Sequence, residues 1–135
     1  MTLRRMQILI ADDHKATRLR LAALLSHRSD WAVCGLAADG QEAVDLAKKS
    51  FPDLAVLDVQ MPRLNGMEAA KAIHRYCPHA IIVSNHDVDL FAGQLKELGV
   101  KGFVDKLHLG TDLVSAVEAV LNGETSFLRP ITRNF

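Results

Sequence analysis

ILIADD, residues 8–13, is a short apolar run that ends in two carboxylates, Asp12 and Asp13. The same pattern recurs in LAVLD (54–58), AIIVS (80–84) and GFVDK (102–106), which end in Asp58, Ser84 and Lys106. Short apolar runs of this kind are typical of strands buried on both faces of a parallel sheet. Open parallel sheets bind their ligands at the carboxyl ends of the strands. The sequence therefore predicts that three carboxylates, a hydroxyl and an ammonium group converge at one sheet edge.

Between these runs the spacing of apolar residues becomes helical. One helix face is predicted over residues 69–77, where Pro78 ends the pattern. Another is predicted over 113–121, with Thr111 as its N-cap and Asn122-Gly123 as its stop. Three more helices are expected after His14, after Asp39-Gly40 (with Phe51 on its apolar face) and over residues 91–98, and a further strand over 31–37. This alternation predicts an α/β fold with helices on both faces of the sheet.

The composition is that of one ordinary globular domain. Its 135 residues are 49% apolar, and 16 basic side chains balance 16 acidic ones, so no net charge attracts nucleic acid or an anionic membrane. Cys34 and Cys77 lie far apart and are expected to be reduced thiols. The first apolar run stops at Asp12, too early for a signal peptide, and we see no transmembrane run. We expect a cytoplasmic protein, and we expect this chain to bind neither membrane nor nucleic acid directly.

The predicted carboxylate cluster needs a cation, because crowded carboxylates repel one another. Mg²⁺ takes oxygen ligands and retains several waters. We expect carboxylate ligands from Asp13 and Asp58, a third oxygen from the backbone carbonyl of Gln60, and a coordinated water held by Asp12. Mn²⁺ is the alternative ion. A single strand-end aspartate often only caps the next helix, but three of them with Lys106 favour a metal site.

Together these residues resemble the response-regulator receiver domains of the CheY-like superfamily, over the chain through Gly123. The resemblance is carried by the strand endings, by Met61-Pro62 and Asn65-Gly66 after Asp58, and by Phe103. Segments 84–87, 99–106 and 122–124 are most similar to receivers of NarL/FixJ/LuxR-type transcriptional regulators. The resemblance implies a flavodoxin-like, doubly wound (βα)5 fold with a five-stranded parallel sheet in the order 2-1-3-4-5.

The resemblance also implies a role for each residue of the site. Asp58 would accept a phosphoryl group from a sensor histidine kinase or a phosphotransfer protein, while Mg²⁺ and Lys106 neutralise the transferring oxygens. Ser84 would bind a phosphoryl oxygen and move inward, and the ring of Phe103 would then rotate from exposed to buried. Such a switch changes the interaction surface. Departures from the common pattern are Leu107, where many receivers have proline, and the missing hydroxyl of Phe103.

Two neighbouring residues have two interpretations each. Gln60 and His86 lie beside the expected site and, by analogy, would tune the phosphate lifetime by controlling the attacking water. The alternative is that both are ordinary exposed loop residues. A Zn²⁺ site is not expected from the six histidines, because they form no ligand motif with one another or with cysteine.

The leading hypothesis is a receiver domain over residues 1–123 whose phosphorylation controls a DNA-binding output and hence transcription. Residues 124–135 resemble the start of a linker to an output domain that this chain does not contain; a single-domain protein with a vestigial tail is the alternative. No substrate turnover is expected, although the domain would catalyse its own phosphorylation and dephosphorylation. A phosphate-independent interaction module is disfavoured because acceptor, acidic pair and lysine are all present. A Mg²⁺-dependent aspartyl phosphatase is disfavoured by Gln60, which stands where a general acid is needed. A second copy of the chain is a further candidate partner.

Overall fold

Five parallel strands form the central sheet of the molecule. The computed structural model describes residues 4–85 and 97–127. The strands are β1 (Met6–Ala11), β2 (Trp31–Ala37), β3 (Leu54–Asp58), β4 (Ala80–Ser84) and β5 (Val100–Asp105). They pair in the order β2-β1-β3-β4-β5, and every pairing is parallel. Both the fold class and the strand order are as predicted. In this order β2 lies on one side of β1 and β3 lies on the other. The connections from β1 and from β3 therefore leave the sheet in opposite directions, which creates a crevice at the carboxyl ends of these two strands.

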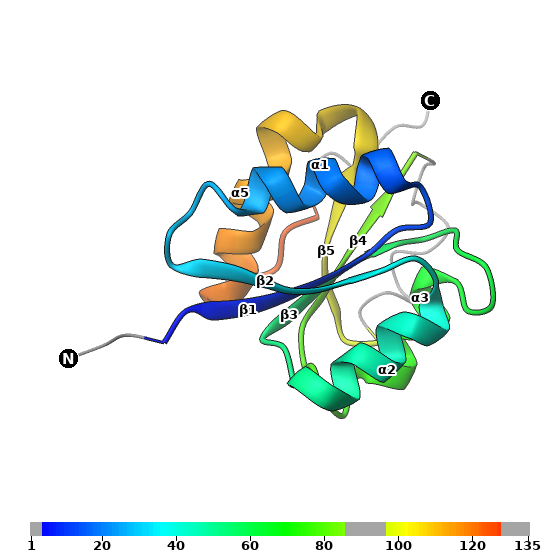
Figure 1. Cartoon of the computed structure of the whole chain (residues 1–135). Helices are drawn as coiled ribbons and strands as arrows, with labels where there is room; N and C mark the ends of the chain where they lie inside the picture. Colours follow the sequence, from blue (N-terminus) through cyan, green and yellow to red (C-terminus); the bar gives the residue numbers. More distant parts are fainter. Residues whose placement is uncertain (1–3, 86–96, 128–135) are drawn as a thin grey trace.

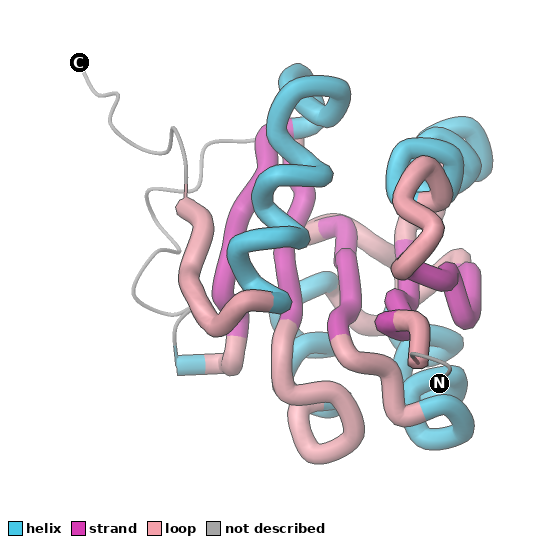
Figure 2. Tube along the Cα trace, turned by 90° about the vertical axis from the view of Figure 1, so that its left-hand side faces the viewer, coloured by secondary structure: helices cyan, strands magenta, loops and turns pink. Residues whose placement is uncertain are grey.

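Helices cover both faces of the sheet (Figure 1; Figure 2). Helices α1 (Lys15–Leu25) and α5 (Leu109–Leu121) lie on one face, and α2 (Gly40–Ser50) and α3 (Gly66–Ile73) lie on the other. A short 3-10 helix, η2 (Lys106–His108), joins β5 to α5. The helix predicted over 91–98 falls mainly on residues 86–96, outside the described residues. Of the helices in the described ranges, none has the length and apolar character that crossing a membrane requires.

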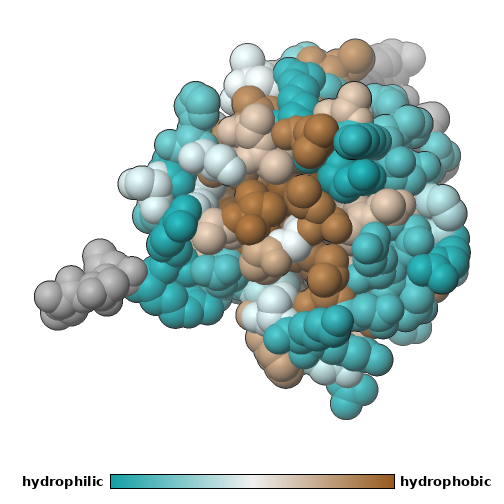
Figure 3. Space-filling view, in the orientation of Figure 1, coloured by the Kyte–Doolittle hydropathy of each residue, from teal (hydrophilic) through white to brown (hydrophobic). Residues whose placement is uncertain are grey.

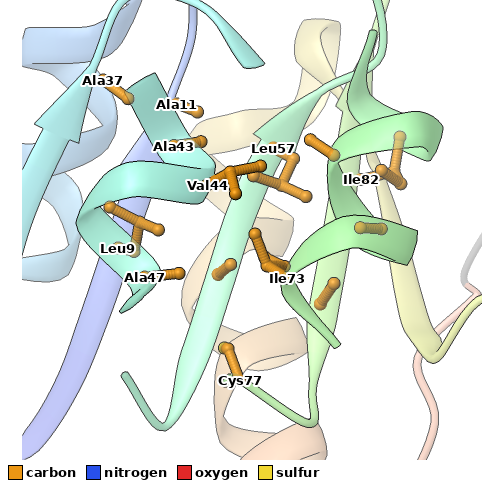
Figure 4. Close-up of a cluster of buried hydrophobic side chains, with 14 of the residues drawn as sticks. Leu9, Ala11, Ala37, Ala43, Val44, Ala47, Leu57, Ile73, Cys77 and Ile82 are labelled. Carbon is orange, nitrogen blue, oxygen red and sulfur yellow. The ribbon is translucent and has the colours of Figure 1, made fainter. Parts of the chain in front are cut away.

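The strands are buried on both sides because their residues alternate between two apolar clusters. In β1, Leu9 packs toward α2 and α3, whereas Ile8 and Ile10 pack toward α1 and α5. Figure 4 shows the cluster between the sheet and helices α2 and α3, where the small side chains of Ala43 and Ala47 let α2 approach the sheet closely. Full burial of one leucine or isoleucine side chain contributes about 1.5–3 kcal/mol. The two clusters therefore hold the strand ends, and the polar side chains on them, in fixed positions.

Polar caps fix where α2 and α3 begin. Asp39 accepts a hydrogen bond from the backbone N–H of Glu42 at the start of α2. Asn65 and Glu68 form a reciprocal capping box at the start of α3. These caps end the loops that follow β2 and β3, so the loop after Asp58 is anchored at both ends.

Three helix ends differ from the sequence prediction. Thr111 is not the N-cap of α5: η2 runs directly into the helix, which begins at Leu109, and the Thr111 hydroxyl instead donates to the carbonyl of His108. α3 ends at Ile73, and the chain reaches Pro78 through turns in which the N–H groups of Tyr76 and Cys77 both donate to the carbonyl of Ile73. Phe51 lies outside the buried face of α2; it has φ 46° at the C-cap and is 59% exposed.

The two edges of the sheet are covered differently. β2 forms one edge, and Figure 3 shows apolar side chains gathered on the side of the molecule where β2 lies. Leu36 of β2 is 38% exposed there. β5 forms the other edge, and residues after α5 return along it, with a parallel bridge between Gly102 and Ser126. Residues 124–127 thus cover part of the β5 edge.

Candidate functional site

The structure brings the acidic strand endings and the lysine together. The ammonium Nζ of Lys106 lies 2.9 Å from Oδ2 of Asp12 and 3.2 Å from Oδ1 of Asp58. The side chains of these three residues are only 10%, 0% and 5% exposed. Lys106 follows β5, Asp12 follows β1 and Asp58 ends β3, so the contact joins three strands through their carboxyl ends. One buried cation therefore links two buried carboxylates.

The two adjacent aspartates have different environments, as expected for neighbours on an extended chain. Asp12 points inward, and its Oδ1 accepts a hydrogen bond from the backbone N–H of His14 at 2.9 Å. Asp13 points to the mouth of the site, with its side chain 31% exposed and its Oδ1 3.1 Å from Nδ1 of His14. Asp12 thus both supports the start of α1 and faces Lys106, whereas Asp13 remains accessible to a ligand.

The loop after β3 holds Asp58 close to the helix that follows. The backbone N–H of Gly66 donates to the carbonyl of Val59 at 3.0 Å. A Cβ at position 66 would lie 2.3 Å from the carbonyl oxygen of Asp58, so only glycine permits this approach. The backbone N–H of Gln60 lies 3.5 Å from Oδ1 of Asp58. Asn65 caps α3 and Gly66 is its first residue, so the start of this helix fixes the backbone around Asp58.

Burial and charge shift the titration of the two central groups. Burial, followed by the negative charge of Asp12, raises the pKa of Asp58, and the ammonium of Lys106 offsets only part of this rise. Burial lowers the pKa of Lys106, but its hydrogen bond to Asp12 and the negative charges of Asp58 and Asp12 outweigh burial, so its pKa is raised. Lys106 therefore stays positive, and Asp58 is a more basic carboxylate than an exposed aspartate.

The donor set at this edge suits a hard divalent cation. Ligand atoms of Asp12, Asp13, His14 and Asp58 all lie within 4.8 Å of one another. A pocket of about 110 Å³ opens over them and is lined by Asp13, His14, Asp58, Val59, Gln60, Asn85 and Lys106. The single ammonium of Lys106 leaves three clustered carboxylates with surplus negative charge. Oxygen ligands with surplus charge beside a small pocket fit Mg²⁺ better than a soft metal.

The remaining predicted site residues differ in where they lie and in how exposed they are. Ser84 ends β4, is 2% exposed, and is one position beyond Val83, the strand partner of Asp58. Phe103 is 4% exposed and packs in the cluster under α2 and α3, so the structure shows its ring in the buried arrangement. Gln60 lines the pocket. His86 lies outside the described residues. Leu107 lies in η2 and is 80% exposed.

Two polar residues at the pocket were missed by the sequence analysis. His14 directly follows the acidic pair, and Asn85 directly follows Ser84, and both line the pocket. Each stands one position after a residue that ends an apolar run. That position in a parallel sheet also faces the crevice, and it is the signal that could have identified them.

Comparison with known proteins assigns the family. The family model described as response regulator receiver domain matches residues 8–118. The chain belongs to this family. It is 31% identical to a LuxR-family two-component response regulator from Aurantimonas sp. SI85-9A1, whose crystal structure superposes with a TM-score of 0.86 over 93% of this chain and 91% of the other. The chain is also similar to proteins described as transcriptional regulatory proteins.

Two curated relatives differ in length. The chain is 32% identical over 125 residues to the uncharacterized transcriptional regulatory protein YxjL of Bacillus subtilis (strain 168), covering 91% of this chain but 57% of the relative. It is 33% identical over 117 residues to protein CcdB of the same organism, covering 85% of this chain and 97% of the relative. The chain therefore spans a little over half of the first relative and nearly all of the second. Receivers of this family are signalling proteins.

Proposed function

We propose that Asp58 is the phosphoryl acceptor of this receiver and that a histidine kinase or a phosphotransfer protein is the donor. The ion pairs of buried Lys106 with Asp12 and Asp58 carry this proposal. A carboxylate oxygen of Asp58 would attack the phosphorus of a phosphohistidine. The P–N bond would break, and its electron pair would stay on the imidazole nitrogen, which then takes up a proton. The raised pKa of Asp58 favours its oxygen as the nucleophile.

The other residues of the site would position and neutralise the reacting group. Lys106 would move from balancing the Asp58 carboxylate to balancing phosphoryl oxygens, with Asp12 holding its ammonium in place. Asp13, Asp58 and the Gln60 carbonyl would hold Mg²⁺, and Asp12 would hold one of its waters. When bound, Mg²⁺ supplies positive charge to phosphoryl oxygens in transfer.

Ser84 and Phe103 would transmit the change to the surface. Ser84 lies one position beyond Val83, the strand partner of Asp58, and its hydroxyl would donate to a phosphoryl oxygen. Phe103 pairs in register with Ile82, two residues before Ser84. The described arrangement, with the Phe103 ring buried, is one of the two states that such a switch requires. Gln60 and His86 would set how long the phosphoryl group survives by controlling water.

The output is proposed from the relatives. In a protein as long as YxjL, residues 124–135 would begin a linker to an output domain, and phosphorylation would control transcription through DNA binding by that domain. The near-complete match to CcdB favours a second candidate, a receiver that acts alone through protein contacts. Both candidates share the same phosphorylation chemistry in the cytoplasm.

Intact mass measurement tests the central step. The protein is incubated with Mg²⁺ and a small-molecule phosphodonor, and one phosphoryl group is expected on the wild type and on Asp45→Ala, the control carboxylate on α2. No addition is expected for Asp58→Ala or in EDTA. Labelled Asp58→Ala would assign the acceptor elsewhere, and an unlabelled wild type would refute the proposal.

A further inference from the structure

The segment after α5 binds the open edge of β5 through main-chain hydrogen bonds. The backbone N–H of Ser126 donates to the carbonyl of Lys101 at 2.8 Å, and the N–H of Phe103 donates to the carbonyl of Ser126 at 2.8 Å. A Cβ on Gly102 would lie 2.9 Å from the Ser126 carbonyl oxygen, so the glycine permits the approach. Residues 124–127 are called the returning segment below.

The returning segment is also packed, so its contact with β5 is more than an edge pairing. Ser126 is 7% exposed. Phe127 is partly buried against the same apolar cluster that contains Phe103. Gly123, with φ of +89°, and the hydrogen bond from the Glu124 N–H to the Ala119 carbonyl turn the chain back toward the sheet. Sequence and packing together direct this segment to one place on β5.

The same strand connects the returning segment to the phosphorylation site. β5 leads directly into Lys106, whose ammonium is held by Asp12 and Asp58. A phosphoryl group would replace the single negative charge of Asp58 with about two. Lys106 would then be held more firmly, and with it the end of β5. A strand with less freedom loses less entropy when a neighbouring segment pairs with it.

We propose that docking of residues 124–127 on β5 is coupled to the phosphorylation state of Asp58, so that phosphorylation strengthens docking and fixes where the chain leaves the receiver. The inference rests on the proposed phosphorylation of Asp58. The occupant of the β5 edge is the chain's own returning segment. Because coupling is reciprocal, release of the segment must weaken binding of a phosphoryl group or its mimic by the same factor.

Amide hydrogen exchange tests the first half of this coupling. The exchange rates of the Phe103 and Ser126 amides are measured in the full chain, with Mg²⁺ alone and after phosphorylation from a small-molecule donor, and intact mass is recorded on the same samples. Slowing of both amides by about fivefold or more is expected, with α5 amides as the internal reference. Unchanged exchange in a phosphorylated sample overturns this inference alone. A sample that gains no phosphoryl mass overturns the proposed function and this inference with it.

Beryllofluoride titration with Mg²⁺ tests the reciprocal half. Ser126→Pro removes the N–H that donates to Lys101, and Phe127→Ala removes packing without changing the main chain. Both variants are expected to bind beryllofluoride about fivefold or more weakly than the wild type. Thr125→Ala, at an exposed position of the same segment, is the matched control and should bind as the wild type does. Equal affinity in all four proteins would refute the coupling.

Discussion

Replacement of Lys106 by methionine should destabilise the protein in a way that depends on metal. The substitution keeps a long side chain but removes the ammonium that lies 2.9 Å from Asp12 and 3.2 Å from Asp58. At an effective dielectric constant of about 20, each contact amounts to about 5–6 kcal/mol of Coulomb attraction, most of which is offset by the loss of hydration. Removing one partner of a buried ion pair typically costs about 3–5 kcal/mol. We expect a loss of about 3 kcal/mol at neutral pH in EDTA.

Urea unfolding followed by tryptophan fluorescence measures this loss. Trp31 is the only tryptophan of the chain, and it is 3% exposed at the start of β2, away from the substitution. Mg²⁺ should recover part of the loss, because the site without the ammonium is more negative and should bind the cation more tightly than the wild-type site does. A cation that binds only the folded state stabilises it by about 2.7 kcal/mol at a hundredfold excess over its Kd, so a lower Kd gives the variant the larger gain. Lys71→Met, at an exposed position of α3, is the control and should change stability by less than about 0.5 kcal/mol.

Two results would refute this reasoning. A loss below about 1 kcal/mol in EDTA would mean that the ammonium is not what offsets the repulsion between Asp12 and Asp58, since breaking a buried pair costs more than that. An equal loss in EDTA and in saturating Mg²⁺ would mean that the cation does not bind the same carboxylates. The first result concerns Lys106, and the second concerns the metal site.

Three further predictions follow from single contacts. Burial and the charge of Asp12 raise the pKa of Asp58 above its ordinary value of 3.8, so its ionised form opposes folding. Asp58→Asn should therefore be more stable than the wild type at pH 7 in EDTA. The difference should shrink as urea unfolding is repeated down to about pH 3, where the wild-type carboxyl is mostly protonated in both the folded and the unfolded state. Gly66→Ala should lower the free energy of unfolding by about 2–3 kcal/mol, because the new Cβ meets the Asp58 carbonyl. Gly110→Ala is the control: its Cβ meets only an arginine side chain at 3.5 Å, so the variant should be more stable than the wild type by up to about 1 kcal/mol. Thermal unfolding of both variants measures the two changes. Burial raises the pKa of Cys77 to about 12, so a thiol reagent at about pH 8 should modify it only after unfolding, as counted by intact mass.

Local patterns predicted the strands well because burial on both faces leaves a strong signal. Each apolar run proposed as a strand lies within one, and the run ending at Asp58 matches β3. The order of the strands is a different matter. It depends on contacts between segments far apart in the chain, such as β1 with β3, and no local spacing encodes it. The strand order therefore came from the family resemblance, which the pairing then confirmed.

Helix ends were harder to predict because the neighbouring element competes for them. Thr111 has the side chain of an N-cap, but η2 enters α5 two residues earlier and sets its start. The helical spacing continues to residue 77, but α3 ends at Ile73, and the N–H groups of Tyr76 and Cys77 both donate to the Ile73 carbonyl in turns after the helix. The return of residues 124–127 to β5 was not predicted, since the main-chain hydrogen bonds of Ser126 that hold it leave no periodic pattern in the sequence.

The repulsion between the buried carboxylates at the strand ends explains why this site needs a cation. Asp12 is fully buried, and its hydrogen bond from His14 supports the start of α1, so the fold itself requires that carboxylate to be inside. Asp58, brought beside it by the β1–β3 pairing, then gains a raised pKa and a need for Lys106. The repulsion that weakens the unliganded fold is thus the same repulsion that draws a cation to the site. A receiver that lost this electrostatic cost would also lose the driving force for binding Mg²⁺ and for holding a doubly charged phosphoryl group.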